Sequence, residues 1–282
     1  MTAGLTSLEG NKKDRQNCTI KVEMRRLLFV IAVVLAAAPA WAQPKSAGAP
    51  DPKVLEDLVA ANRVLADLGV VDGFGHVSVR HDKDSSHYLM ARSMAPALVG
   101  LADILEYDLD SVAVDDKGRA LYLERFIHGE IYKARPDVKA IVHSHSPSVI
   151  PFGVSTVKLR PVYHMSSFLG VDVPVFEIRD SQGTATDLLV RNPQIGAALA
   201  KALGNNTVVL MRGHGSVAVG NSIPEVVFRA YYTEMNARLQ AEAMRLGTVT
   251  YLTPEEAAAS AKTNAGVLAR AWELWKRKAL KD

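Results

Sequence analysis

Hydrophobic and polar residues alternate in some stretches of this chain and follow a helical spacing in others. A period of two, or a short apolar β-branched run, predicts strands at 75–81, 88–91, 109–114, 119–122, 140–145 and 173–178, and two more within 208–219. Helical spacing predicts helices at 52–68, 124–134, 147–152, 184–203 and 222–246, and a last helix that opens at Thr253. The polar turns at 82–86 and 116–118 predict that the strands flanking each turn form a hairpin.

Residues at the predicted helix ends agree with these assignments. Asp51–Pro52 combines an N-cap residue with proline at the first helical position, and Gly69 ends the same helix. Ser222 and Thr253 are each followed three residues later by glutamate, which is the pattern of a capping box. Strands with helices between them favour a single α/β domain over 51–282, with a mostly antiparallel central sheet flanked by helices.

Residues 1–42 have the pattern of a leader that is removed from the mature protein. Arg25 and Arg26 precede the apolar run Leu27–Ala38, and Ala40–Ala42 provides a small-residue cleavage site. The apolar run is short for a membrane span, although an uncleaved anchor is the alternative. We expect translation to begin at Met24 and the protein to be exported to the periplasm or secreted. After cleavage of the leader, the mature protein is expected to have no membrane partner. Residues 43–50, rich in Ala, Gly, Pro and Ser, are expected to form a flexible linker.

The basic character of the whole chain belongs to this leader. Of 33 Lys and Arg and 30 Asp and Glu residues, cleavage after Ala42 leaves 27 of each. A neutral mature chain gives no reason to expect a nucleic acid as partner. The only cysteine, Cys18, also lies in the leader, so the mature chain has neither disulfides nor thiolate chemistry.

Three histidines and one glutamate have the spacing of a catalytic metal site. His143 and His145 end the strand at 140–145, where side chains two residues apart point the same way and their Cα atoms lie about 6 to 7 Å apart. His214 lies between two glycines that allow a close approach of the backbone. Glu124 opens a predicted helix and is the candidate catalytic acid or base. Three imidazoles can hold a divalent ion, since imidazole accepts zinc, manganese, iron and copper, and leave a ligand position open for substrate.

Other polar residues are weaker candidates. His164, in a segment without regular pattern, is either a proton donor or extra ligand, or an ordinary hydrogen-bonded histidine. Arg92 and Arg212 can each hold a substrate carboxylate, although a surface ion pair is the simpler interpretation of both.

The remaining histidines near these motifs are expected to have supporting or no roles. His128 lies one helical turn after Glu124 and is expected to support the site rather than bind the ion. His81 and His87 flank a turn and are expected to be exposed to solvent.

The order of Glu124, His128, His143-x-His145 and the Arg212-Gly-His-Gly block resembles the class II aldolase and adducin N-terminal domain family, from about Pro52 to the C-terminus. The resemblance implies a helix-flanked sheet of nine strands and a ring-shaped homotetramer. It also implies a divalent metal, zinc or manganese, and a small-molecule substrate.

The chain departs from the phosphate-using aldolases of that family. Those enzymes carry Gly-Asn-x-Ser on the first strand and a pair of serines before the catalytic glutamate, where this chain has Gly75–Ser78 and Tyr122–Leu123. The chain is therefore similar to the branch that includes decarboxylases of hydroxylated pyridine dicarboxylates. The expected function is a metal-dependent carbon-carbon lyase, a decarboxylase or aldolase, acting on a non-phosphorylated hydroxy-aromatic or hydroxy-carboxylate substrate. Two alternatives are an Fe(II)-dependent oxygenase on the same scaffold and an adducin-like binding module without catalysis.

Overall fold

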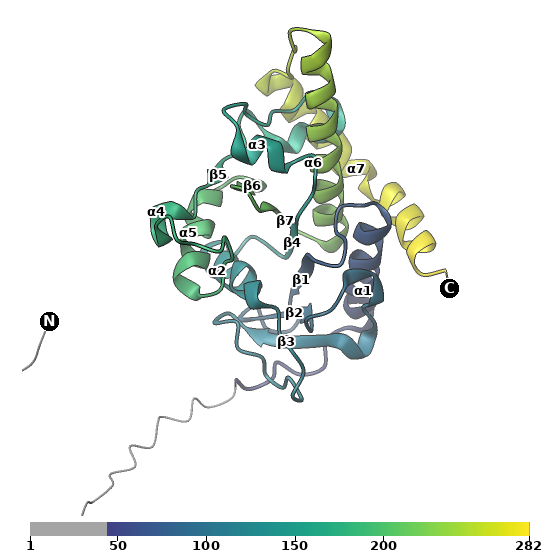
Figure 1. Ribbon diagram of the computed structural model, residues 1–282. Coiled ribbons are helices and arrows are strands. Elements are labelled where there is room, and N and C mark those ends of the chain that lie inside the picture. Colours follow the sequence, from purple (N-terminus) through teal and green to yellow (C-terminus); the bar gives the residue numbers. More distant parts are fainter. Residues whose placement is uncertain (1–43, 282) are drawn as a thin grey trace, which may run out of the picture. The chain divides into compact units, whose positions relative to one another are not determined.

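The structure is a computed structural model that describes residues 44–281 (Figure 1). Within these residues seven strands form one sheet in the order β3-β2-β1-β4-β7-β6-β5. Every neighbouring pair is antiparallel except β5 and β6, which are parallel. The strands are β1 His76–Arg80, β2 His87–Ala91, β3 Ile104–Asp108, β4 Ala140–Ser144, β5 Val175–Phe176, β6 Val208–Met211 and β7 Gly215–Gly220. The predicted fold class, a mostly antiparallel sheet flanked by helices, is confirmed.

Helices cover both faces of this sheet, with α2 and α5 on one face and α1, α6 and α7 on the other (Figure 1). The α-helices are α1 Pro52–Asp67, α2 Phe126–Ala134, α3 Ile150–Val154, α4 Arg179–Gln182, α5 Pro193–Leu203, α6 Ile223–Leu246 and α7 Pro254–Ala279. Short 3₁₀ helices are η1 Pro96–Leu98, η2 Leu101–Asp103, η3 Leu123–Arg125 and η4 His164–Leu169. The predicted N-caps are present: the side chains of Asp51, Ser222 and Thr253 accept hydrogen bonds from the first turns of α1, α6 and α7.

The central strand β4 shows how the sheet divides the core into two parts. Ala140 and Val142 pack with α1 and α6 on one face, whereas Ile141 packs with α2 and α5 on the other. Because side chains alternate along a strand, His143 points to the same face as Ile141. The face covered by α2 and α5 therefore carries the end of the metal-site motif.

Two expectations about the sheet are wrong. The predicted hairpin of 109–114 and 119–122 is absent, and β3 instead occupies Ile104–Asp108 beside β2. Ser111 has φ +63°, a left-handed backbone that interrupts an extended strand, and only the single bridge between Tyr107 and Ala113 follows β3. The sheet of the described residues also has seven strands rather than nine.

Residues 44–50 have no regular secondary structure, but they are tied to the edge of the sheet more closely than a flexible linker would be. Ser46 Oγ and the Ala47 N–H donate to the two carboxylate oxygens of Glu106, over 2.6 and 2.7 Å. The leader at 1–42 lies outside the described residues. No helix from 44 to 281 combines the length and apolar character needed to cross a bilayer.

This N-terminal segment also explains why the expected exposure of two histidines is wrong. His81 and His87 are both buried. His81 Nε2 lies 3.1 Å from the Gly48 carbonyl oxygen, and His87 lies beside Glu106. The polar turn at 82–86 is exposed as expected, but the segment before α1 covers the residues at its base.

Candidate metal centre

Four side chains from three separate parts of the chain converge at one end of β4. His143 lies on β4 and His145 directly after it, while His214 lies in the tight turn between β6 and β7. The register of β4 and β7, which sets Ser144 opposite Ser216, brings that turn alongside the two β4 histidines. Glu124 reaches the same point from η3, just before α2. The metal-ligand candidates predicted from sequence are therefore brought together.

The distances within this cluster fit a single metal ion. The Nε2 atoms of His143 and His145 are 3.2 Å apart, and those of His145 and His214 are 2.9 Å apart. One oxygen of Glu124 lies 3.5 Å from His143 Nε2 and 3.3 Å from His214 Nε2. Ligands placed tetrahedrally at about 2.1 Å from one ion are about 3.4 Å from each other, so these separations match a shared coordination sphere.

Hydrogen bonds at the far side of two rings show which nitrogen faces the cluster. His143 Nδ1 lies 3.1 Å from the Ser216 carbonyl oxygen, and His214 Nδ1 lies 2.8 Å from the Leu188 carbonyl oxygen. A carbonyl only accepts, so both rings carry a proton on Nδ1 and, when neutral, an unprotonated Nε2. Unprotonated nitrogens aimed at one point are the arrangement that a metal ion stabilises, and a carbonyl behind each ring is the usual support for metal-binding histidines.

Glu124 is held so that only one of its oxygens is available. Its Oε1 accepts a hydrogen bond from the Val190 N–H at 2.9 Å, and its Oε2 faces the imidazoles. Burial by itself would raise the pKa of Glu124, but its hydrogen bonds with His143 and His214 outweigh burial and hold the pKa far below its ordinary value. The residue also has φ −91° and ψ 19°, a sparsely populated backbone region in which active-site residues are common.

Neighbouring imidazoles shift the protonation of one another. Burial, and then the charge of His143, lowers the pKa of His145 to about 4. For His214, burial is the largest effect and lowers the pKa, but the hydrogen bond with Glu124, its negative charge and the Leu188 carbonyl together raise the pKa more, so the net direction is upward. Around pH 7 the arrangement therefore provides a charged carboxylate and a neutral His145, both of which are ready to bind a cation.

Gly215 explains how the β6–β7 turn can approach β4 so closely. A Cβ atom at this position would lie 2.0 Å from the Ser144 carbonyl oxygen and 3.0 Å from the Cα of His145. Any side chain would push the turn away from β4 and carry His214 with it. The close backbone approach expected of the glycines around His214 is present.

The segment Leu188–Val190 supports two of the four side chains and was missed by sequence reasoning. The Leu188 carbonyl orients His214, and the Val190 N–H orients Glu124. Leu188 itself has φ +69°, which is unfavourable for a leucine and is typical of strain kept at a functional site. Backbone support of this kind leaves no signal in the sequence.

A cavity of about 540 Å³ opens beside the cluster. Its walls carry more apolar than polar surface, and Phe74, Met94 and Leu123 are among the apolar side chains. No lysine or arginine is among the described residues that line it. The full lining is Gly73, Phe74, Gly75, His76, Ser93, Met94, Ala95, Tyr122, Leu123, Glu124, His143, His145 and Leu189.

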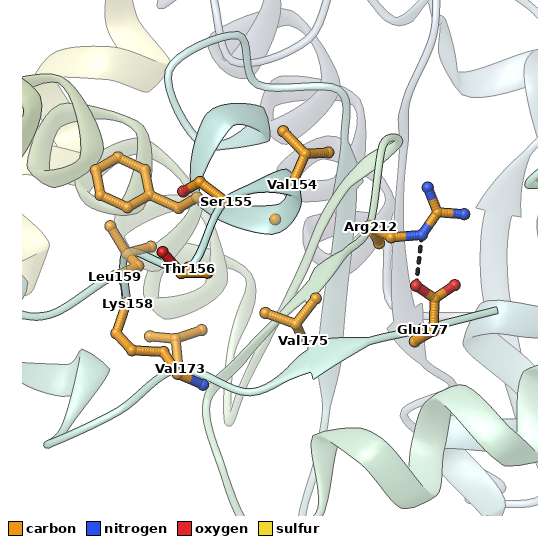
Figure 2. A pocket seen from close by; sticks show the side chains of 11 residues that line it. Val154, Ser155, Thr156, Lys158, Leu159, Val173, Val175, Glu177 and Arg212 are labelled. Atoms are coloured by element: carbon orange, nitrogen blue, oxygen red, sulfur yellow. Dashed lines mark ion pairs between the residues drawn. The ribbon is translucent and has the colours of Figure 1, made fainter. Parts of the chain in front are cut away.

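The other candidates from sequence do not join the cluster. Arg92 pairs with Asp103, with 2.7 Å between Nε and Oδ1. Arg212 pairs with Glu177 at 2.6 Å in the wall of a different cavity, as Figure 2 shows. Both arginines thus form the ion pairs that were the simpler interpretation. His164 is exposed at the start of η4 and does not line the cavity.

Two further histidines lie directly behind the cluster. His128, expected to support the site, is fully buried on α2, and burial lowers its pKa to about 3. Burial, followed by the charge of His128, lowers the pKa of His76 well below its ordinary value. His76 was not singled out from sequence, because only the pairing of β1 with β4, which sets it opposite His143, shows that it belongs to the site.

Comparisons with known proteins agree with this fold. Residues 56–241 match the family "Class II Aldolase and Adducin N-terminal domain". The chain is 40% identical to the decarboxylase tropJ of Talaromyces stipitatus over 78% of this chain and 91% of that protein. It is 32% identical to a 3,4-dihydroxyphthalate decarboxylase of Arthrobacter keyseri over 68% and 79% of the two chains. An L-fuculose 1-phosphate aldolase structure, 22% identical, superimposes with a TM-score of 0.66 and covers 78% of this chain and 99% of its own.

These findings confirm two expectations from the sequence, the family and an enzyme of the lyase class. The family match covers most of the chain, and the match with the decarboxylase tropJ covers 91% of that protein. The chain belongs to the class II aldolase and adducin N-terminal domain family.

Proposed function

We propose that this lyase is a metal-dependent decarboxylase of hydroxy-aromatic carboxylates that carry no phosphate. The observation that carries the proposal is the cavity beside the His143, His145, His214 and Glu124 cluster, which is largely apolar and has no lysine or arginine in its lining. A phosphate group would find no fixed positive charge there, whereas a planar ring finds Phe74 and Leu123. Two relatives named as decarboxylases, one of them for 3,4-dihydroxyphthalate, support the same choice.

Each residue of the cluster has a defined task in this reaction. The three imidazoles would hold the ion, which would supply positive charge to substrate oxygens as negative charge develops on them. Decarboxylation breaks a bond between two carbons and forms a bond to hydrogen, so a proton has to reach the ring carbon. Glu124 lines the cavity and its Oε2 lies 3.3 Å from His214 Nε2, and we assign the proton transfer to it. The apolar walls limit the access of water.

The metal is proposed to be zinc or manganese, with iron as the third option. Imidazoles with one carboxylate accept all three ions, so the choice rests on which metal the protein retains. Metal analysis of purified protein, together with the His214→Ala variant, tests the site itself. We expect the variant to lose most of its metal, since two imidazoles chelate more weakly than three. Full metal content in His214→Ala would refute the proposed set of ligands.

Activity is tested by measuring release of carbon dioxide from the metal-loaded protein. We expect release from dihydroxy-aromatic acids such as 3,4-dihydroxyphthalate and 2,3-dihydroxybenzoate, and no cleavage of L-fuculose 1-phosphate. Cleavage of the sugar phosphate without decarboxylation would contradict the proposal. Oxygen consumption without carbon dioxide release would favour an iron oxygenase instead.

We further propose that the protein is exported and that the leader is cleaved after Ala42. The charged, apolar and small-residue regions of residues 24–42 support this proposal. Mass spectrometry of the native protein should find Gln43 as the first residue. A soluble protein that retains Met1 or Met24 would overturn it.

The mature protein is proposed to be a homotetramer. Several large apolar side chains remain exposed on the described part of the chain, and burial between subunits would remove them from water. They include Phe74, Leu98, Leu101, Leu123 and Val154. Light scattering of the purified protein should give four times the mass of one chain, and a monomer at micromolar concentration would contradict the proposal.

A further inference from the structure

His76 lies in the wall of the metal cavity but is not among the four clustered side chains. Its ring centre is 5.0 Å from that of His143 and 4.6 Å from that of Tyr122. Nδ1 lies 2.6 Å from His128 Nε2, deep behind the cluster. The other nitrogen, Nε2, has no hydrogen-bond partner among the described residues, and it is not one of the side-chain atoms sealed from solvent. It therefore faces the cavity.

A buried chain of hydrogen bonds continues behind His76. His128 Nδ1 lies 2.6 Å from Ser78 Oγ, and Ser78 Oγ lies 2.8 Å from the Tyr132 hydroxyl. The same hydroxyl is 3.4 Å from the Lys139 carbonyl oxygen, so the shorter contact to Ser78 is the stronger one. The four side chains joined by these hydrogen bonds are almost completely buried, and none of them needs a charge to satisfy its partners. They are His76, Ser78, His128 and Tyr132.

The direction of these hydrogen bonds depends on the Tyr132 hydroxyl, and we assign its proton to the nearer Ser78 Oγ, because the Lys139 carbonyl already accepts from the Arg80 N–H at 2.7 Å. If the Tyr132 hydroxyl donates to Ser78, the Ser78 hydroxyl donates to His128 Nδ1. His128 then carries its proton on Nε2 and donates to His76 Nδ1. A neutral His76 is left with its own proton on Nε2, which is the nitrogen on the cavity side. The buried chain thus presents an uncharged N–H group to whatever occupies the cavity.

We propose that His76 is a substrate-binding residue whose Nε2–H donates a hydrogen bond to the carboxylate that is removed in the reaction. This inference rests on the proposed decarboxylase function. An uncharged donor suits that task, because a lysine or arginine would stabilise the negative charge of the bound substrate, which is lost as the carbon-carbon bond breaks. His128, Ser78 and Tyr132 act through His76 and are positioning residues.

The test compares two ligands that differ only at the group in question. 2,3-Dihydroxybenzenesulfonate has the two hydroxyls and an anionic group that cannot leave as carbon dioxide, and catechol has the hydroxyls alone. Dissociation constants are measured by calorimetry on the zinc-loaded protein and on two variants with equal zinc content. Asparagine in His76→Asn can replace Nδ1 but does not reach the position of Nε2, whereas glutamine in His76→Gln reaches it.

We expect His76→Asn to weaken binding of the sulfonate about 10- to 100-fold, the range for loss of a hydrogen bond to a charged group, with catechol affinity unchanged within about twofold. His76→Gln should recover most of the sulfonate affinity. Equal losses for both ligands, or no loss for either, would overturn the role of His76 and leave the decarboxylase proposal standing. If the unaltered protein bound neither ligand, the hydroxy-aromatic substrate class would be wrong, and the role of His76 with it.

Discussion

The carbonyl oxygens of Ser216 and Leu188 determine which nitrogen His143 and His214 present to the metal site. Such support is local in space and remote in sequence: His214 and Leu188 are 26 residues apart. His143 and His145 were predicted as ligands from their spacing and His214 from its flanking glycines, and Glu124 was predicted as the catalytic acid or base from its place at the start of a helix. Their orientation, and the presence of His76 beside them, depend on strand pairing that no short motif contains.

Glu124→Gln tests proton transfer at the residue scale. Glutamine keeps the shape of the side chain and can accept the Val190 hydrogen bond, but it cannot take up a proton. We expect near-normal folding and metal content with turnover reduced by about 10² to 10⁴, measured by carbon dioxide release. Glu130→Gln, on α2 outside the cavity lining, is the matched control and should keep normal turnover. Loss of metal in step with activity would make Glu124 mainly a ligand.

His128 links the buried site to the pH dependence of stability. Burial lowers its pKa to about 3 in the folded protein, compared with an ordinary value of 6.5. Below about pH 6.5 the unfolded chain binds a proton at His128, whereas the folded chain does not bind it until the pH approaches 3. The free energy of unfolding therefore decreases as the pH falls from about 6.5 towards 3. In metal-free protein, His128→Gln should reduce the slope of unfolding free energy against pH by up to about 1.4 kcal/mol per pH unit. Urea unfolding between pH 6.5 and 5 measures it, and an unchanged slope would refute a neutral buried His128.

At the scale of elements, the site depends on the contact between β4 and the β6–β7 turn. The two strands and the glycine-flanked bend between them were predicted from sequence, as were the capped helices, because these signals are local. The hairpin predicted at 109–122 failed because its pattern of apolar residues gave no indication of the left-handed backbone at Ser111. Which strand takes the edge of β2 is decided by packing, and Ile104–Asp108 buries Leu105 and Tyr107 there.

Gly215→Ala tests that contact. A methyl group at this position meets the Ser144 carbonyl oxygen, so we expect a loss of about 1–3 kcal/mol in unfolding free energy and weaker metal binding through displacement of His214. Gly266→Ala is the control: Gly266 is exposed on α7 with open space around it, and alanine there should stabilise the protein by about 0.5–1 kcal/mol. Thermal unfolding and metal analysis measure both variants. Equal stability of Gly215→Ala and the unaltered protein would contradict the close approach of the two strands.

For the whole molecule, the sheet forms the boundary between two apolar cores, and the metal cluster lies at the end of the face covered by α2 and α5. The order of strands and helices indicated the fold class. The small residues of the segment 44–50 predicted a flexible linker, but Ser46 and Ala47 bind Glu106. Contacts that join the start of a chain to a distant sheet edge depend on the completed fold.

No lysine or arginine is among the described residues that line the cavity, and this determines the order in which the metal ion and the substrate can bind. Since no described residue of this lining carries a fixed positive charge, an incoming carboxylate would depend on the charge of the ion, so metal has to be in place before substrate can be retained. Occupancy by substrate should follow the supply of metal, and a metal-starved enzyme should be empty rather than blocked. Calorimetric titration of 2,3-dihydroxybenzenesulfonate into chelator-treated protein should give no binding heat, and binding should return when zinc is added. Retention of the anion without metal would show that its charge is balanced elsewhere in the cavity.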